Sequence, residues 1–179
     1  DLLFDAKLPC AFPYAKSKFQ LTEETNSAEV MMTAIGQGKT QVSPYHMVLI
    51  ASAIGNGGIL MEPYLVDRIE SHTGTSVEKN MPRKYTELMT SQEASVLKDY
   101  MLKVVENGTA SALKSEKYVV AGKTGTAEYS SDKDKAHSWF MGFTNPDNPD
   151  LAISIVVESA DNSGMSAVSV AKKILNAYY

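Results

Sequence analysis

The chain has 179 residues, of which 44% are hydrophobic, and it carries a formal net charge of −4. This length suits one domain or a large piece of one, and the charge gives no general electrostatic footprint for nucleic acid. No apolar stretch reaches the roughly 18 residues that a membrane span requires, so we expect no membrane contact by this chain. The single cysteine, Cys10, excludes an internal disulfide. Because the chain begins with Asp1 rather than Met, we expect it to come from a longer protein.

The N-terminal part predicts helices after an irregular start. Residues 1–27 contain two prolines and many polar side chains, so we expect a long ordered loop. Ser43 can cap a helix, and Pro44 fits its first turn. The apolar residues that follow predict a buried helix over about 44–56. A strand is expected over 64–71, with a turn and a short return strand after it.

The second half predicts a longer helix, a sheet and a final helix. Thr90 and Glu93 form a capping box, and apolar residues then recur at helical spacing as far as Gly108. The turn-rich loop 145–150 favours an antiparallel hairpin between the last two strands. A helix over about 165–178 could cover the sheet. The expected strands cover 118–129, 137–144 and 151–159.

These elements predict an α+β fold in which helices cover an antiparallel sheet. We expect one domain portion over 1–179. It would comprise an irregular lead-in over 1–27, a mainly helical part over 28–115, and a three-strand sheet with its C-terminal helix over 116–179. An edge strand of such a sheet can bind an extended peptide through its backbone groups.

The segment from Val119 to Glu128 is the most informative stretch for function. Lys123 can supply positive charge, and the hydroxyl groups of Thr124 and Thr126 can donate hydrogen bonds to a carboxylate. Strand alternation places the two threonines on one face. Gly125 has no side chain, so another backbone or a ligand could approach closely there. A backbone N–H of this strand could also donate to an oxyanion.

Two Gly-Lys-Thr triplets suggest a phosphate-binding loop, but neither has the complete motif. That loop needs a further glycine five residues before the second one, and Thr33 and Lys117 occupy these positions. The three histidines lie far apart and lack metal-ligand spacing. We therefore expect no nucleotide, no metal and no other cofactor.

Lys-Thr-Gly is a motif of serine acyl-transferases of the penicillin-binding and β-lactamase group. On its own the triplet is weak, but further motifs surround it in a specific order and spacing. Together they closely resemble the C-terminal part of the transpeptidase domain of class B-like penicillin-binding proteins, from about residue 28 to the end. The supporting segments are Ala34–Gly38, Val42–Pro44, Gly55–Gly58, Val104–Ala110, His137–Phe143 and Ile153–Glu158.

This resemblance implies a partial penicillin-binding or β-lactamase-like fold and the cross-linking of peptidoglycan through an acyl-serine intermediate. Lys123 would join the catalytic polar network, and the N–H of Thr126 would form half of the oxyanion hole. The hydroxyl groups of Thr124 and Thr126, beside Gly125, would bind the carboxylate of a stem peptide or a β-lactam. Trp139 and Phe140 would belong to the sheet core. Gln37 would belong to a structural turn.

The chain departs from the family pattern in its nucleophile. The family order is Ser-x-x-Lys, then Ser-x-Asn, then Lys-Thr-Gly, and this chain has no Ser-x-Asn. We interpret its Ser-x-x-Lys matches as solvated positions and expect the nucleophile before Asp1, in the N-terminal half of the same domain. The parent protein would carry an N-terminal membrane anchor and act on the extracytoplasmic face of the bacterial cell membrane. The matches begin at Ser76, Ser95, Ser111, Ser130 and Ser169.

Two alternative functions remain open. A serine β-lactamase would share Lys-Thr-Gly and hydrolyse the acyl-enzyme with water, and nitrocefin turnover by the parent would identify it. A β-lactam sensor or transpeptidase-like scaffold without catalysis would look the same over these residues. The sequence before Asp1 discriminates the second alternative, because a scaffold would lack Ser-x-x-Lys and Ser-x-Asn there.

Overall fold

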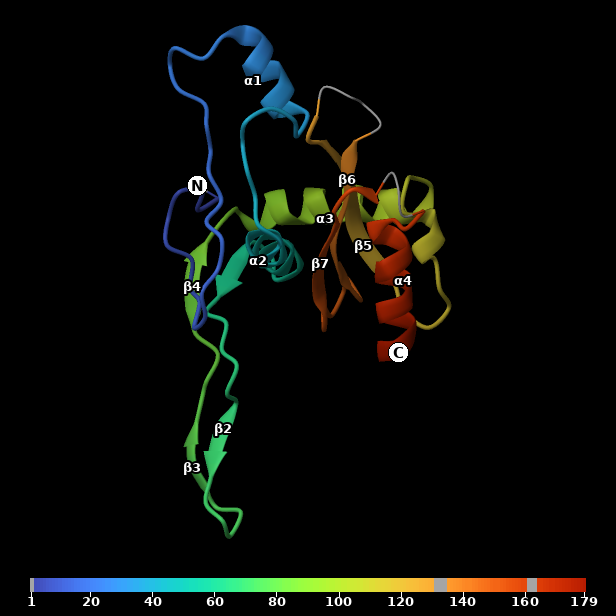
Figure 1. The fold of residues 1–179 in the computed structure, drawn as a ribbon. Coiled ribbons are helices and arrows are strands. Elements are labelled where there is room, and N and C mark those ends of the chain that lie inside the picture. Colours follow the sequence, from blue (N-terminus) through green and yellow to red (C-terminus); the bar gives the residue numbers. More distant parts are fainter. Residues whose placement is uncertain (1, 131–134, 161–163) are drawn as a thin grey trace.

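The structure is a computed structural model that describes residues 2–130, 135–160 and 164–179. It has the α+β organisation that the sequence predicts, with a three-stranded antiparallel sheet between helices (Figure 1). The α-helices are α1 (Ser27–Ala34), α2 (Pro44–Gly55), α3 (Ser91–Glu106) and α4 (Ala167–Tyr178), and a 3₁₀ turn, η1, covers Ser111–Leu113. The strands are β1 (Ile59–Met61), β2 (Arg68–Glu70), β3 (Ser76–Lys79), β4 (Lys84–Glu87), β5 (Val120–Glu128), β6 (Ala136–Thr144) and β7 (Ala152–Val157).

The main sheet has the strand order β5-β6-β7, so β5 and β7 are its edges. Thr124 lies opposite Phe140, and Thr126 lies opposite Ser138. The sequence predicted all three strands and the hairpin between β6 and β7. For β6 and β7 this agreement arises because segments rich in apolar residues are separated by a turn-rich loop, and such punctuation is a local signal.

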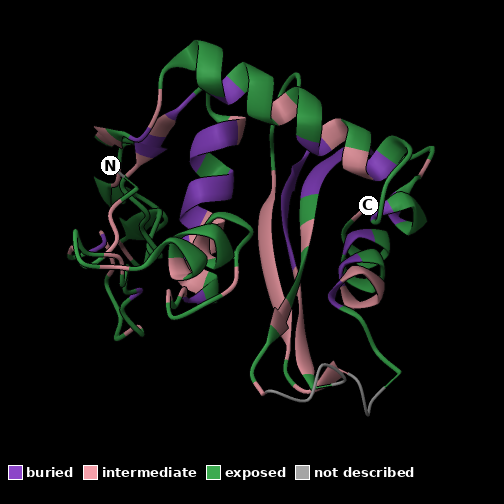
Figure 2. Ribbon diagram, turned by 90° about the horizontal axis from the view of Figure 1, so that it is seen from above, coloured by how far each residue is buried: buried purple, intermediate pink, exposed green. Residues whose placement is uncertain are grey.

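The helices pack on both faces and across one end of the sheet (Figure 2). On one face α2 packs against the sheet, and the buried side chains of Leu49 and Ile54 join Phe143 in one core cluster. On the other face α4 contributes Ala171 and Leu175 to a second cluster. The helix α3 runs across the end of the sheet where β5 begins (Figure 2). The capping box of Thr90 and Glu93 begins α3, as the sequence predicted.

Two glycines of the main sheet leave room for a buried aromatic ring. Gly122 and Gly142 lie opposite each other in β5 and β6. A Cβ atom on Gly122 would lie only 2.5 Å from Cζ of Phe140, which is itself fully buried. A Cβ atom on Gly142 would lie 3.2 Å from the same Cζ. The ring of Phe140 therefore packs where side chains at these two positions would otherwise stand.

The structure corrects several local expectations in the first half. Helix α1 was not predicted, because none of its residues is buried and its sequence lacks an apolar stripe. Its one local signal is Asn26, whose side chain accepts a hydrogen bond from the backbone N–H of Glu29. The strand expected over 64–71 is shorter, since β2 covers only Arg68–Glu70.

The four short strands β1 to β4 form two separate two-stranded sheets. The sequence predicted the hairpin of β2 and β3, with its turn and short return strand, but not the pairing of β1 with β4. Strands β2 and β3 are exposed on both faces, and their hairpin projects away from the body of the molecule (Figure 1). An exposed strand has no alternation between buried and solvated residues, so the sequence lacks the period that would fix where β2 begins and ends. No helix within the described residues is long and apolar enough to cross a membrane.

His46 is a buried titratable group in α2, with a relative exposure of 1%. Its Nε2 lies 2.7 Å from the backbone oxygen of Leu2, and its ring packs against Phe4. Its Nδ1 is buried and has no hydrogen-bond partner among the described residues. Burial lowers the pKa of His46 below its usual value of 6.5, and the contact with the Leu2 oxygen opposes this only in part. The ring is therefore neutral in the folded protein near neutral pH.

This lowered pKa predicts a loss of stability in mild acid. Below about pH 6.5 the unfolded chain protonates His46 while the folded chain does not, so the free energy of unfolding should fall as pH falls. The slope should approach, for this one group, about 1.4 kcal/mol per pH unit until the folded pKa is reached. Denaturant unfolding between pH 7.5 and 5 should show this slope in the wild type and a smaller one in His46→Gln. His72→Gln, at an exposed position, should keep the wild-type slope, and equal slopes in all three proteins would contradict the prediction.

Candidate functional site

Strand β5 carries the predicted site residues on the free edge of the sheet. Val120 packs into the cluster under α4, whereas Ala121 packs into the cluster under α2. Side chains alternate along a strand, so Thr124 and Thr126 share the α4 face and Lys123 lies on the α2 face. These residues come from the half of β5 beyond its buried start, and Lys123 and Thr126 are exposed to solvent. Lys123, Thr124, Gly125 and Thr126 therefore form one accessible segment.

The backbone groups of Thr124 and Thr126 face away from β6. In an antiparallel pair, the N–H and C=O groups of one residue point toward the same side of its strand. The Lys123 ammonium group donates a hydrogen bond to the Thr124 carbonyl oxygen. Nε2 of Gln37 donates to the Thr126 carbonyl oxygen over 2.9 Å. The side chains of Lys123 and Gln37, which lie outside the ladder, thus donate to the carbonyl oxygens of Thr124 and Thr126. The backbone groups of these two threonines therefore face the outer edge of the sheet.

A second hydroxyl group lies beside Thr124. The Oγ1 atoms of Thr109 and Thr124 are 2.6 Å apart, which is a hydrogen bond. Thr109 stands between α3 and η1, directly after Gly108. A Cβ atom on Gly108 would lie 2.8 Å from the Val104 carbonyl oxygen, so only glycine allows the chain to turn this closely after α3. The end of α3 thus positions Thr109 against β5.

Trp139, the neighbour of Gly125 in the ladder, differs from what the resemblance implied. Trp139 lies opposite Gly125 in the ladder, and a Cβ atom on Gly125 would lie 3.3 Å from Cβ of Trp139. The space beside the Gly125 α-carbon is therefore bordered by Trp139. The prediction that Trp139 and Phe140 both belong to the sheet core is confirmed for Phe140 alone. Trp139 is half-buried and lies outside both core clusters.

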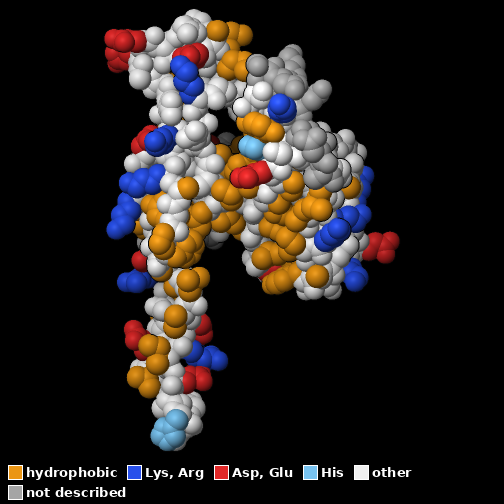
Figure 3. Space-filling model, viewed as in Figure 1, with side chains coloured by type: hydrophobic (Ala, Val, Ile, Leu, Met, Phe, Trp, Pro, Cys, Tyr) orange, Lys and Arg blue, Asp and Glu red, His pale blue; other side chains and the backbone are white. Residues whose placement is uncertain are grey.

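Two cavities differ in how they lie relative to this segment. One of about 330 Å³ borders Thr126 and lies between the end of the sheet and the start of α4, where Ser138 and Ser166 line it. A larger one of about 590 Å³ lies along the first half of α3, between Leu88 and Val96, and does not include β5. Figure 3 shows hydrophobic side chains over much of the face that the sheet presents in this view. The position of the Lys-Thr-Gly segment therefore follows from strand geometry and not from cavity size.

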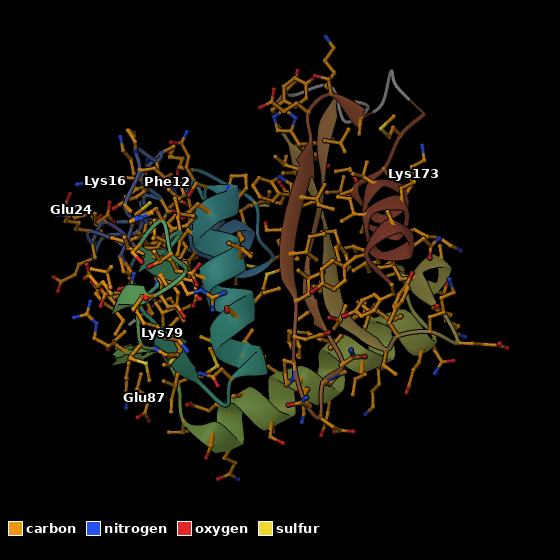
Figure 4. The ribbon with its side chains drawn as sticks, turned by 90° about the horizontal axis from the view of Figure 1, so that it is seen from below. Phe12, Lys16, Glu24, Lys79, Glu87 and Lys173 are labelled. Atoms are coloured by element: carbon orange, nitrogen blue, oxygen red, sulfur yellow. The ribbon has the colours of Figure 1, made fainter. Side chains whose placement is uncertain are left out.

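The described Ser-x-x-Lys matches are separate from this site. Ser76 and Lys79 belong to the β2–β3 hairpin, and Lys79 lies on the side of α2 away from the main sheet (Figure 4). Ser95 is an exposed residue of α3, and Ser111 is exposed in η1. Ser169 caps α4 together with Ser166. The partner lysine of Ser130, Lys133, lies outside the described residues. None of these features marks an activated nucleophile.

Sequence reasoning overlooked two residues that contact the segment. The resemblance implied that Gln37 belongs to a structural turn and gave its side chain no contact. Thr109 was recognised within the motif Val104–Ala110 but was given no contact of its own. A three-dimensional contact between Gln37 and Thr126 has no local signature, because the two residues are 89 positions apart.

Comparisons with known proteins identify the family of this chain. The family model described as "Penicillin binding protein transpeptidase domain" matches residues 2–177. A "Peptidoglycan D,D-transpeptidase PbpA" of Mycolicibacterium smegmatis is 27% identical over 157 residues, which are 84% of this chain and 31% of that protein. "Stage V sporulation protein D" of Bacillus subtilis is 30% identical over 158 residues, covering 86% of this chain and 24% of that protein.

Solved structures show the same fold. Penicillin-binding protein A of M. tuberculosis, in an imipenem acyl-enzyme complex, superimposes with a TM-score of 0.82 at 24% identity, over 99% of this chain and 40% of that one. Its ceftriaxone acyl-enzyme complex has a TM-score of 0.75 at 28% identity, over 91% of this chain and 37% of that one. The chain thus spans less than a third of the two curated relatives named above and about two fifths of these structures.

Proposed function

Because the chain belongs to the penicillin-binding protein transpeptidase family, we propose that it forms the carboxylate-binding and oxyanion side of a D,D-transpeptidase active site. One observation carries this proposal: Lys123–Thr126 lies on an edge strand whose outward backbone groups are accessible to an extended peptide. Edge pairing is a common way to bind such a peptide. The proposed ligands are peptidoglycan stem peptides and the β-lactams that resemble their ends.

Each residue of the segment has a proposed part in this chemistry. The hydroxyl groups of Thr124 and Thr126, on one face of β5, donate to the substrate carboxylate. Lys123, on the other face, joins the catalytic polar network with its positive charge. The outward N–H of Thr126 donates to the carbonyl oxygen of the scissile bond as that oxygen becomes negative. Gly125 keeps this part of the edge free of a side chain. None of these groups acts as the nucleophile in this proposal. The carboxylate-binding and oxyanion side therefore binds the substrate and stabilises the oxyanion but does not attack the carbonyl carbon.

The attacking serine is proposed to lie in a segment that precedes Asp1 in the parent protein. Its hydroxyl oxygen adds to the penultimate D-Ala carbonyl, the C–N bond breaks, and the terminal D-Ala leaves with the proton. An amine of a second stem peptide then takes the acyl group, and the serine recovers its hydroxyl hydrogen. The relatives named as D,D-transpeptidases support this reaction class. Since peptidoglycan lies outside the cytoplasmic membrane, we place the parent on the extracytoplasmic face, anchored at its N-terminus.

A labelling experiment tests this proposal. The 179-residue chain and the longer parent protein are each incubated with a fluorescent penicillin and separated by denaturing electrophoresis. We expect a covalent fluorescent band for the parent only, because a chain without the nucleophilic serine cannot form an acyl-enzyme. Penicillin-blocked parent is the control for specific labelling. A band from the isolated chain would contradict the placement of the nucleophile, and an unlabelled parent would favour the non-catalytic scaffold.

A further inference from the structure

The side chain of Gln37 bridges two separate parts of the fold. It comes from the loop between α1 and α2 and donates from Nε2 to the Thr126 carbonyl oxygen over 2.9 Å. Gly36 and Gly38 flank it with φ angles of 81° and 92°. This left-handed region is open to glycine at little cost and strained for most other residues. The two glycines thus give the loop the tight conformation that presents Gln37 toward β5.

The loop is braced against α1. The backbone N–H of Gln37 donates to the Met32 carbonyl oxygen over 2.9 Å. Lys39 and Glu29 form a salt bridge of 2.6 Å between the loop and the helix. The carboxamide of Gln37 is therefore presented by a loop with its own contacts. It is half-buried, whereas Gln41, four residues on, is exposed.

The hydrogen bond matters because of where Thr126 lies. On the inner side of β5, the ladder with β6 holds the peptide units in place. On the outer side no strand of the described sheet does so, because β5 is an edge. Gln37 thus replaces a ladder donor on the outward Thr126 carbonyl. An edge-bound peptide would use the N–H and C=O of this same residue, so their orientation decides how it binds.

We propose that Gln37 is a positioning residue of the acyl-transfer site: its carboxamide holds the Thr126 peptide unit in the orientation that binds the substrate backbone. This inference rests on the function proposed above. Gln37 acts through Thr126 and needs no contact with the reacting atoms. The carbonyl oxygen has two lone pairs, so it can accept from Gln37 and from a substrate N–H together.

Kinetics of the parent protein test this inference. Gln37→Met removes the donor at similar size, and Gln37→Glu replaces it with a carboxylate that repels the carbonyl oxygen. Both should lower the first-order rate of β-lactam acylation about three- to tenfold, which is the effect of one net hydrogen bond, with a melting temperature close to that of the wild type. Gln41→Met and Gln41→Glu are matched controls in the same loop and should acylate like the wild type. Wild-type acylation rates in both Gln37 variants would overturn the inference.

Carbonyl NMR tests the contact without any activity. With ¹³C-carbonyl threonine and ¹⁵N-alanine, this chain contributes the pairs Thr33–Ala34, Thr109–Ala110 and Thr126–Ala127. We expect Gln37→Met to move the Thr126 carbonyl signal upfield and to leave that of Thr109 unchanged. Thr126→Ser assigns the signal, since it removes the labelled threonine. An unmoved Thr126 signal would overturn the inference, whereas a parent that no penicillin acylates would overturn the proposed function.

Discussion

Replacing Lys123 by alanine in the parent protein is expected to lower the second-order rate of β-lactam acylation about 10²–10³-fold, the effect of losing one preorganised donor at a developing negative charge. Lys123 is exposed on β5 and forms no salt bridge among the described residues, so its charge is available to a ligand. Stopped-flow or gel-based labelling with a fluorescent penicillin measures this rate.

Two further variants serve as controls for the position and the charge of Lys123. Lys117→Ala removes an exposed lysine shortly before β5 and should leave the rate unchanged. Lys123→Arg keeps the charge and should lie between the wild type and Lys123→Ala. A Lys123→Ala protein that is acylated as fast as the wild type would show that Lys123 has only a structural part, and the assignment of β5 to the active site would lose its main support.

Replacing Phe140 by alanine is expected to cost about 3–5 kcal/mol of unfolding free energy, the usual range for a buried phenylalanine. Phe140 is fully buried, pairs directly opposite Thr124, and its ring packs over the α-carbons of Gly122 and Gly142. Gly122→Ala should cost about 1–3 kcal/mol, because the new methyl group collides with that ring. Chemical denaturation measures both values.

The double variant tests the cause of these losses. If the ring and the added methyl compete for one space, Gly122→Ala should cost less in the Phe140→Ala background. A coupling energy of about 0.5–3 kcal/mol is typical of residues in contact. Strictly additive losses of unfolding free energy would contradict the proposed packing. The cost of Gly122→Ala would then come from a collision of the new methyl group with the backbone of β6 instead.

The elements that the sequence predicted well are those with local signals. Helix α3 has a capping box and an apolar stripe, and α2 has Ser43 as its cap with Pro44 in the first turn. Strands β6 and β7 are rich in apolar residues and flank a turn-rich loop, and β5 begins with the buried apolar residues Val120 and Ala121. By contrast, α1 buries none of its residues and was not predicted. The β2–β3 hairpin was predicted from its turn, but its exposed strands have no burial pattern that would fix their bounds.

The candidate site was predictable in part for a related reason. Lys123 to Thr126 are contiguous, so a strand assignment alone places them together and sets their alternation. The contacts of Gln37 and Thr109 depend on how separate elements meet, and no local period encodes this. Trp139 illustrates the same limit, because the resemblance implied the sheet core for it, yet it is half-buried and borders Gly125.

Mapping the acylated serine tests the central claim most directly. The parent protein would be treated with a penicillin, digested, and its adduct located by tandem mass spectrometry. We predict an adduct on one serine that precedes Asp1, within Ser-x-x-Lys, and none within residues 1–179. An adduct on Ser76, Ser95, Ser111, Ser130 or Ser169 would contradict the claim that this chain forms the carboxylate-binding and oxyanion side of the site and does not contain the nucleophile.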